Sequence, residues 1–225
     1  MKVHRFFINF QESSVVKIQD KEYINQIKNV LKLKPSERVV LIKNNCEFLF
    51  ELEIVSKEFI QLKLLSKELK ETKSRKTILY CAIIKKDNFE MLCQKTTECG
   101  VFKIVPIITE RTVKKDINLQ RIEKILKEAS EQSGRMNIPI LSKPISFEKA
   151  IKEASQNDLN LFFDFNGKKD FEIKNNINSI GLFIGPEGGF TENENTLANG
   201  FEKIQLKDNI LRAETAAIIA TYLYS

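Results

Sequence analysis

Residues 180–190, IGLFIGPEGGF, join an uninterrupted apolar run to a turn rich in glycine and proline. The run Ile180–Ile184 is typical of a strand that is buried on both faces, as in a parallel sheet. The following residues, 185–189, hold three glycines and one proline, a composition that favours a tight turn and lets backbone approach a ligand closely. Because ligands bind beyond the carboxyl ends of parallel strands, this turn is predicted to border a binding site.

The sequence on both sides of this stretch alternates between apolar runs of strand length and amphipathic segments of helical spacing. Such alternation predicts an α/β domain built on a parallel sheet. Ser146 and the run Thr191–Glu194 have the character of helix N-caps, and Gly100 and Gly200 that of helix ends. The predicted strands are Ile78–Ile84, Lys103–Ile108, Leu159–Phe165, Ile180–Ile184 and Lys203–Leu206, and the predicted helices are Asn88–Cys99, Ile117–Ser133, a helix following Ser146, a short one following Thr191, and Ala213–Tyr224.

The first 70 residues have a different pattern, with short strand-like runs and one helical segment. This pattern predicts a small β-rich module, a barrel, over residues 1–70, and a second domain over residues 76–225. The polar, charged segment Lys67–Lys76 is expected to link them. The predicted strands of the module are Arg5–Ile8, Arg38–Ile42, Glu47–Ile54 and Phe59–Leu65, and its predicted helix is Tyr23–Leu31.

Composition and charge narrow the class of protein. No apolar run approaches the ~18 residues that span a bilayer, and residues 1–10 lack a secretory signal pattern, so we expect a cytoplasmic protein. The four cysteines form no CxxC pair and His4 is the single histidine, so no metal site is expected. Residues 1–150 carry 29 Lys and Arg against 19 Asp and Glu, whereas residues 151–225 carry 7 against 11. This asymmetry favours a polyanion-binding front and a separate small-molecule pocket.

A second motif, residues 209–217 (NILRAETAA), joins the last predicted strand to the last predicted helix. Glu214 near the start of a helix is favoured by the helix dipole, whereas Arg212 is not. An arginine placed against this preference suggests pairing with a glutamate or a substrate. The alternative is an ordinary helix start with an exposed ion pair, which would contribute little stability.

Together the two motifs resemble the SPOUT class of methyltransferases, and within it the RsmE family, which methylates N3 of uridine in small-subunit ribosomal RNA. Further similarity runs through residues 94–101 (QKTTECGV), Pro106, Arg111 and residues 128–135 (EASEQSGR) to Pro139, and the opening Arg5-Phe6-Phe7 also fits. The resemblance covers essentially the whole chain. One departure is Lys207, which stands where the family usually has a glycine.

The resemblance implies a C-terminal domain whose chain forms a deep trefoil knot, a PUA-like N-terminal barrel that binds RNA, and a homodimer. It also implies that the loops of the knot bind S-adenosylmethionine as cofactor and act on small-subunit ribosomal RNA, with no membrane and no metal involved. The cofactor-binding residues implied by position are Ile184, Gly185, Glu187, Gly188, Leu206, Ile210, Leu211, Arg212, Thr215 and Ala216.

Methylation of a uridine ring nitrogen requires removal of its proton, and catalytic roles follow from that need. Glu187 and Glu214 are the candidate bases, and Arg212 is the candidate for stabilising charge on the uracil oxygens. Phosphate contacts need cations. The candidates for RNA binding are Arg5, Lys32, Arg38, Arg111, Lys114 and Arg135.

Two other functions stay open on the sequence alone. A related methyltransferase could act on a tRNA base or a ribose 2′-hydroxyl, and a ribosome-assembly factor could bind RNA without catalysis. A dinucleotide-dependent dehydrogenase is excluded, because the chain has no G-x-G-x-x-G fingerprint after a strand.

Overall fold

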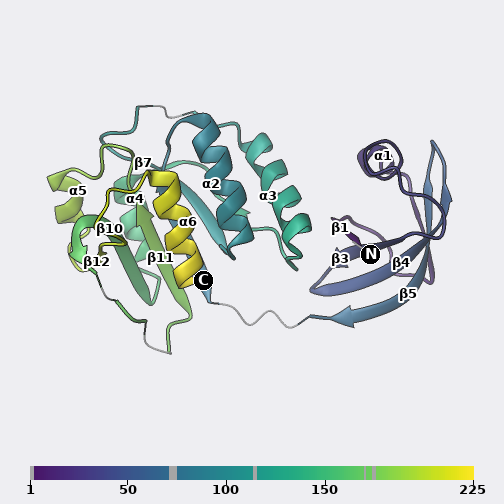
Figure 1. Cartoon of the computed structure of the whole chain (residues 1–225). Coiled ribbons are helices and arrows are strands. Elements are labelled where there is room, and N and C mark those ends of the chain that lie inside the picture. Colours follow the sequence, from purple (N-terminus) through teal and green to yellow (C-terminus); the bar gives the residue numbers. More distant parts are fainter. Residues whose placement is uncertain (1–2, 71–74, 114–115, 170, 174–175) are drawn as a thin grey trace. The chain divides into compact units, whose positions relative to one another are not determined.

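A computed structural model describes residues 3–70, 75–113, 116–169, 171–173 and 176–225 (Figure 1). The chain forms two compact units. One contains residues 1–72 together with 130–137, and the other contains residues 73–129 and 138–225. The short segment 130–137, which the sequence analysis placed in the C-terminal domain, thus groups with the N-terminal residues.

The first unit is built on a five-stranded sheet with the order β1-β3-β4-β5-β2. Strands β3 and β4 form a hairpin whose turn residues Asn44 and Asn45 have φ values of 49° and 58°. Asparagine tolerates this left-handed conformation, which suits the twist of a two-residue hairpin turn. The elements are β1 (His4–Phe7), β2 (Val15–Ile18), α1 (Lys21–Asn25), η1 (Gln26–Val30), β3 (Arg38–Lys43), β4 (Cys46–Val55) and β5 (Ile60–Leu69).

Strand β1 pairs with β3 in parallel, and the other neighbours in this sheet are antiparallel. Buried aromatic rings fill the core, with Phe6 edge-on to Tyr23 and Phe10 edge-on to Phe48 and Phe50. Within the described residues no pairing joins β1 to β2, so closure of this sheet into a barrel stays a prediction.

The second unit is built on a seven-stranded sheet in which every described pairing is parallel. Its order is β12-β10-β11-β6-β7-β8, and β9 also pairs with β7. The predicted parallel α/β architecture is therefore confirmed. The strands are β6 (Lys76–Ala82), β7 (Lys103–Ile108), β8 (Ile140–Leu141), β9 (Ile145–Ser146), β10 (Leu159–Lys168), β11 (Ser179–Ile184) and β12 (Glu202–Ile204), and the helices are α2 (Lys86–Glu98), α3 (Leu119–Ser133), α4 (Phe147–Ala154), α5 (Glu192–Leu197) and α6 (Ala213–Tyr224).

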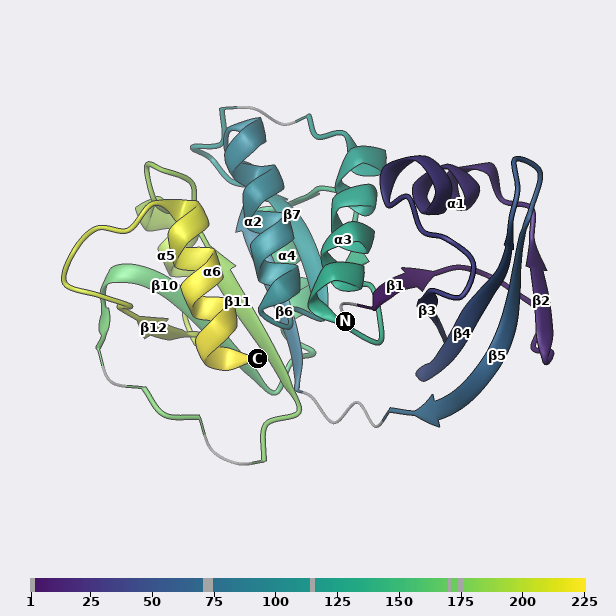
Figure 2. The same cartoon turned by 45° about the vertical axis from the view of Figure 1, so that its right-hand side comes forward.

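Helices cover both faces of this sheet (Figure 2). Helices α2, α3 and α6 pack on one face, where Leu79 and Cys81 of β6 are fully buried. Helices α4 and α5 lie on the other face, against Tyr80 and Phe183, whose rings stack with centroids 4.5 Å apart. Alternate residues of β6 thus enter opposite cores, which explains why its sequence is apolar without interruption.

Most local predictions agree with the observed elements. Ser146 accepts a hydrogen bond from the backbone of Lys149 as N-cap of α4, Thr191 and Glu194 form the full capping box of α5, and Gly100 follows α2 with φ of 107°. The sequence pattern did not predict the short strands β2, β8 and β9, and two predicted elements differ in type or bounds. The predicted helix Tyr23–Leu31 is a short α-helix followed by a π-helical turn, and β5 extends to Leu69 into the expected linker.

Candidate functional site

A cavity of about 450 Å³ lies in the second unit, beyond the carboxyl end of β11. Three segments that are distant in sequence surround it: the middle of β10, the loop after β11, and the segment from β12 to the first turns of α6. Its lining residues are Phe163, Asp164, Phe165, Ile184, Gly185, Pro186, Glu187, Gly188, Gly189, Phe190, Ile204, Gln205, Leu206, Lys207, Asn209, Ile210, Leu211, Arg212, Ala213 and Ala216.

The loop of residues 185–190 forms one wall of this cavity and is tightly constrained. The N–H of Gly189 donates to the carbonyl of Pro186 at 2.8 Å, and Gly189 has φ of 68°, a conformation that favours glycine. A Cβ atom on Gly185 would lie 3.2 Å from two ring carbons of Phe190. That ring is buried against Phe162, with centroids 4.2 Å apart. The composition of the motif therefore follows from close backbone and ring packing.

Arg212 and Glu214 occupy the start of α6 with very different exposure. Arg212 is the N-cap residue in extended conformation, and its side chain is 82% exposed. The side chain of Glu214 is 5% exposed, with Oε1 4.0 Å from Nη1 of Arg212. Its Oε2 has no hydrogen-bond partner among the described residues. Arg212 lines the cavity, whereas Glu214 does not.

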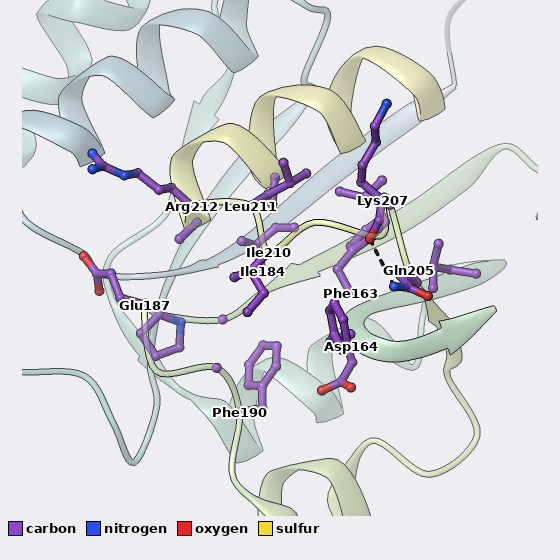
Figure 3. A pocket seen from close by; sticks show the side chains of 18 of the residues that line it. Phe163, Asp164, Ile184, Glu187, Phe190, Gln205, Lys207, Ile210, Leu211 and Arg212 are labelled. Carbon is purple, nitrogen blue, oxygen red and sulfur yellow. Dashed lines mark hydrogen bonds between the residues drawn. The ribbon is translucent and has the colours of Figure 1, made fainter. Parts of the chain in front are cut away.

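Charged side chains lie at both ends of the cavity (Figure 3). Glu187 and Arg212 extend at one end, and Asp164, Gln205 and Lys207 lie at the other. Gln205 donates from Nε2 to the carbonyl of Lys207 at 3.1 Å, which fixes the turn there. Lys207 has no positive φ, so the turn accepts a lysine in place of glycine without backbone strain.

Nine of the ten residues assigned to the cofactor line this cavity, and Thr215 does not. The sequence analysis missed the contribution of β10, namely Phe163, Asp164 and Phe165. The rule that ligands lie at the carboxyl ends of strands could have found them, because they end the apolar run 159–165. The nine residues are Ile184, Gly185, Glu187, Gly188, Leu206, Ile210, Leu211, Arg212 and Ala216.

The candidate RNA-binding residues have varied surroundings. Lys32 and Arg38 are exposed. Arg5 forms an ion pair with Glu47, with 3.1 Å between Nε and Oε1. Arg135 donates to Asn137, and burial lowers the pKa of its guanidinium. Lys114 lies outside the described residues.

Arg111, the sixth candidate, lies in the turn after β7 and contacts the cavity loop. Its Nη1 donates to the carbonyl oxygen of Gly188 and to that of Phe190, the latter at 3.4 Å. A Cβ on Gly188 would lie 3.3 Å from Cδ of Arg111. This arginine therefore supports the loop from outside, because it does not itself line the cavity.

In the described part of the chain, no group of three or more His, Cys, Asp or Glu side chains could hold a metal ion. Nor is any helix in those ranges sufficiently long and apolar to cross a bilayer. Burial raises the pKa of the Cys81 and Cys93 thiols.

Comparison with known proteins relates this chain to a family. Residues 70–225 match a protein-family model whose description is RNA methyltransferase domain. A Rickettsia conorii protein named ribosomal RNA small subunit methyltransferase E is 33% identical, covering 98% of this chain and 94% of its own length. The chain belongs to the ribosomal RNA small subunit methyltransferase E family. The family member of Mesomycoplasma hyopneumoniae is 31% identical over 96% of both chains.

Solved structures of this methyltransferase family share the fold. The enzyme of Neisseria gonorrhoeae, solved with bound S-adenosylmethionine, is 27% identical with a TM-score of 0.88, covering 99% of this chain and 96% of its own. A Legionella pneumophila protein solved in complex with the same cofactor is 30% identical with a TM-score of 0.87, covering 100% of this chain and 97% of its own.

Proposed function

We propose that this protein transfers a methyl group from S-adenosylmethionine to N3 of a uridine in small-subunit ribosomal RNA. The observation that carries the proposal is the cavity lined by both sequence motifs, in a fold shared with two proteins solved with this donor. Its apolar walls suit an adenosyl group, and the glycines of residues 185–189 leave backbone groups open to polar edges.

When bound, S-adenosylmethionine supplies a methyl group on a sulfonium sulfur. The protein must hold the uracil nitrogen in line with that group and remove the proton from N3. We assign proton removal to Glu187, because its side chain reaches one end of the cavity, where Arg212 also lies (Figure 3). Arg212 is exposed and free to stabilise negative charge on the uracil oxygens.

Glu214 has a different role in this proposal. It is buried and does not line the cavity, and its carboxylate lies 4.0 Å from the guanidinium of Arg212, so it acts by orienting Arg212. Replacing each glutamate in turn by glutamine distinguishes the roles of the two carboxylates. Glu187→Gln should abolish methyl transfer, whereas Glu214→Gln should lower the rate without abolishing it.

The trefoil knot and the homodimer belong to the same proposal. Helix α6 carries two large apolar side chains at its exposed face, Tyr222 and Leu223, with 73% and 55% exposure. A second copy packing on this face would cover them, and exposed apolar patches of this kind mark interfaces. Light scattering should give the mass of a dimer for the wild-type chain and of a monomer for Tyr222→Lys.

RNA binding is assigned to the basic first part of the chain, which includes Arg5, Lys32, Arg38 and Arg135. Contacts to phosphates release counterions, so affinity for RNA should fall steeply as salt rises. We place the enzyme in the cytoplasm because its proposed substrate is assembled there.

The decisive experiment uses purified protein, labelled S-adenosylmethionine and separate pools of small-subunit ribosomal RNA and tRNA, followed by nucleoside mass spectrometry. The proposal expects N3-methyluridine in the ribosomal RNA alone. Label in tRNA or in a ribose 2′-O-methyl group would support the related methyltransferase instead. RNA binding without heat on titration with S-adenosylmethionine would support the non-catalytic factor.

A further inference from the structure

The turn that follows β7 is rigid and faces the loop that forms the cavity wall. Thr109 and Thr112 are both buried, and their hydroxyl oxygens lie 2.8 Å apart. The N–H of Thr109 also donates to the hydroxyl of Thr112 at 3.0 Å, and the N–H of Thr112 donates to the carbonyl of Thr109 at 3.1 Å. These bonds fix the two residues between them, Glu110 and Arg111.

Arg111 and Glu194 connect this turn and the segment 188–194 through backbone groups in opposite directions, and Oε1 of Glu110 also accepts a hydrogen bond from Nδ2 of Asn193 at 3.1 Å. From the turn, Arg111 donates to the carbonyls of Gly188 and Phe190. From the other side, Glu194 accepts from the N–H of Glu110 at 2.9 Å through Oε1. The loop is therefore held at its middle by a cation and just beyond its end by an anion.

Glu194 joins the local and the long-range contacts in one buried group. It is 2% exposed, and its Oε2 accepts from the N–H of Thr191 at 2.9 Å, which is the reciprocal bond of the capping box. A capping glutamate normally satisfies one backbone donor, and it is usually exposed at a helix start. Here both carboxylate oxygens are used, one in the capping box and one on the turn after β7.

We infer that Arg111 and Glu194 together are positioning residues that hold loop 185–190 in the conformation that binds the methyl donor. The inference rests on the proposed function. Neither side chain lines the cavity, so each acts through the loop. The carbonyls that Arg111 contacts belong to residues of the cavity wall, and displacement of those residues would change the wall directly.

The test measures the Kd of S-adenosylhomocysteine and of S-adenosylmethionine by calorimetry, for Arg111→Ala, Arg111→Lys and Glu194→Gln. A glutamine at position 194 can accept only one of the two N–H groups and turns its own NH₂ toward the other. We expect Arg111→Ala and Glu194→Gln each to raise Kd about tenfold, because the loop loses a hydrogen bond that holds its conformation. Arg111→Lys should recover part of the affinity, since an ammonium can reach one carbonyl.

Glu192→Gln is the matched control, because it removes the same charge from an exposed position of the same helix. Its Kd should equal that of the wild type. In the double variant Arg111→Ala with Glu194→Gln, the rise in Kd should be smaller than the product of the two single effects, since both act on one loop.

If Arg111 and Glu194 only stabilise the fold, Arg111→Ala and Glu194→Gln should lower the melting temperature, whereas Kd for the donor measured well below that temperature should be unchanged. That result would overturn the inference. A direct phosphate contact predicts that Arg111→Ala raises KM for RNA without changing Kd for the donor, which would also overturn it. Arg111 is exposed, so its alanine variant is expected to fold even if the buried site at 194 does not tolerate glutamine. Absence of donor binding by the wild-type chain would instead refute the proposed function itself.

Discussion

A single methyl group added at Gly185 should disturb the donor cavity strongly, and the same addition at Gly188 should not. A Cβ at position 185 would lie 3.2 Å from two ring carbons of Phe190. This ring cannot move away freely, because it packs against Phe162 at 4.2 Å and Phe147 at 5.4 Å between centroids. Overpacking of a rigid site costs about 1–3 kcal/mol.

The magnitude sets the size of the measured effect. If about 2 kcal/mol is spent in displacing the loop, Gly185→Ala raises the Kd of S-adenosylhomocysteine by roughly 30-fold. If the loop instead keeps its geometry and the strain remains in the folded protein, the same energy lowers the melting temperature by roughly 4–8 °C. Calorimetric titration measures the loss of affinity and thermal unfolding measures the loss of stability. Together the two free-energy losses should account for the cost of about 2 kcal/mol.

Gly188→Ala is the matched comparison. Its Cβ would lie 3.3 Å from Cδ of Arg111, a flexible and exposed side chain that can adjust its torsion angles. We expect its Kd to rise less than that of Gly185→Ala, because the Arg111 side chain can adjust whereas the packed ring of Phe190 cannot. The reasoning would be refuted if Gly185→Ala matched the wild type in both affinity and melting temperature, or if the two variants were equally impaired.

Three further perturbations follow from the same structure. Arg212→Ala should abolish methyl transfer while the melting temperature changes little, because this side chain is 82% exposed; near-normal turnover would remove Arg212 from the site. Thr191→Ala should destabilise the protein by about 1 kcal/mol through loss of the N-cap, whereas Thr191→Ser should be close to neutral in urea unfolding. The carboxylate of Asp158 accepts hydrogen bonds from the N–H groups of Ser179 and Asn178, which lower its pKa below the ordinary value of 3.8. The contribution of Asp158 to folding stability is therefore complete above pH 3.8 and is lost as the pH falls through the lowered pKa. Asp158→Asn should therefore be less stable than the wild type at pH 7, and the difference should disappear in acid; a constant difference would contradict this assignment.

Elements with a strong local signal were predictable from sequence. Ser146 and Thr191 carry short side chains that bond backbone N–H groups at helix starts, and the two asparagines 44 and 45 suit a hairpin turn. The long parallel strands were predictable because burial on both faces leaves a continuous apolar run.

Elements without such a signal were missed. Strands β8 and β9 have two residues each, too few to show any period, and β2 (Val15–Ile18) alternates over only four residues. The π-helical turn at residues 26–30 has the same apolar spacing as an α-helix over so short a distance. The trefoil knot has no local signature at all, and its expectation came from family resemblance.

The candidate site was likewise predictable from sequence only in part. The residues that line the cavity from the two motifs were found because each motif has unusual composition beside a strand end. The contact of Arg111 with the loop was not found, because 77 residues separate it from Gly188 in sequence. Glu194 was recognised as a capping residue, yet its bond to the backbone of Glu110, 84 residues away, depends on how two strand ends meet in space.

Helix α6 packs on β6, the first strand of this sheet to be synthesised, and this packing has a consequence for folding during translation. Thr77 on β6 donates to the carbonyl of Tyr224 at 3.1 Å across 147 residues, and Ala217 and Ala220 of α6 close the core over Leu79. Contacts between such distant segments form slowly, because a long loop must first be closed. A nascent chain that has not yet released this helix therefore displays an uncovered apolar surface on β6.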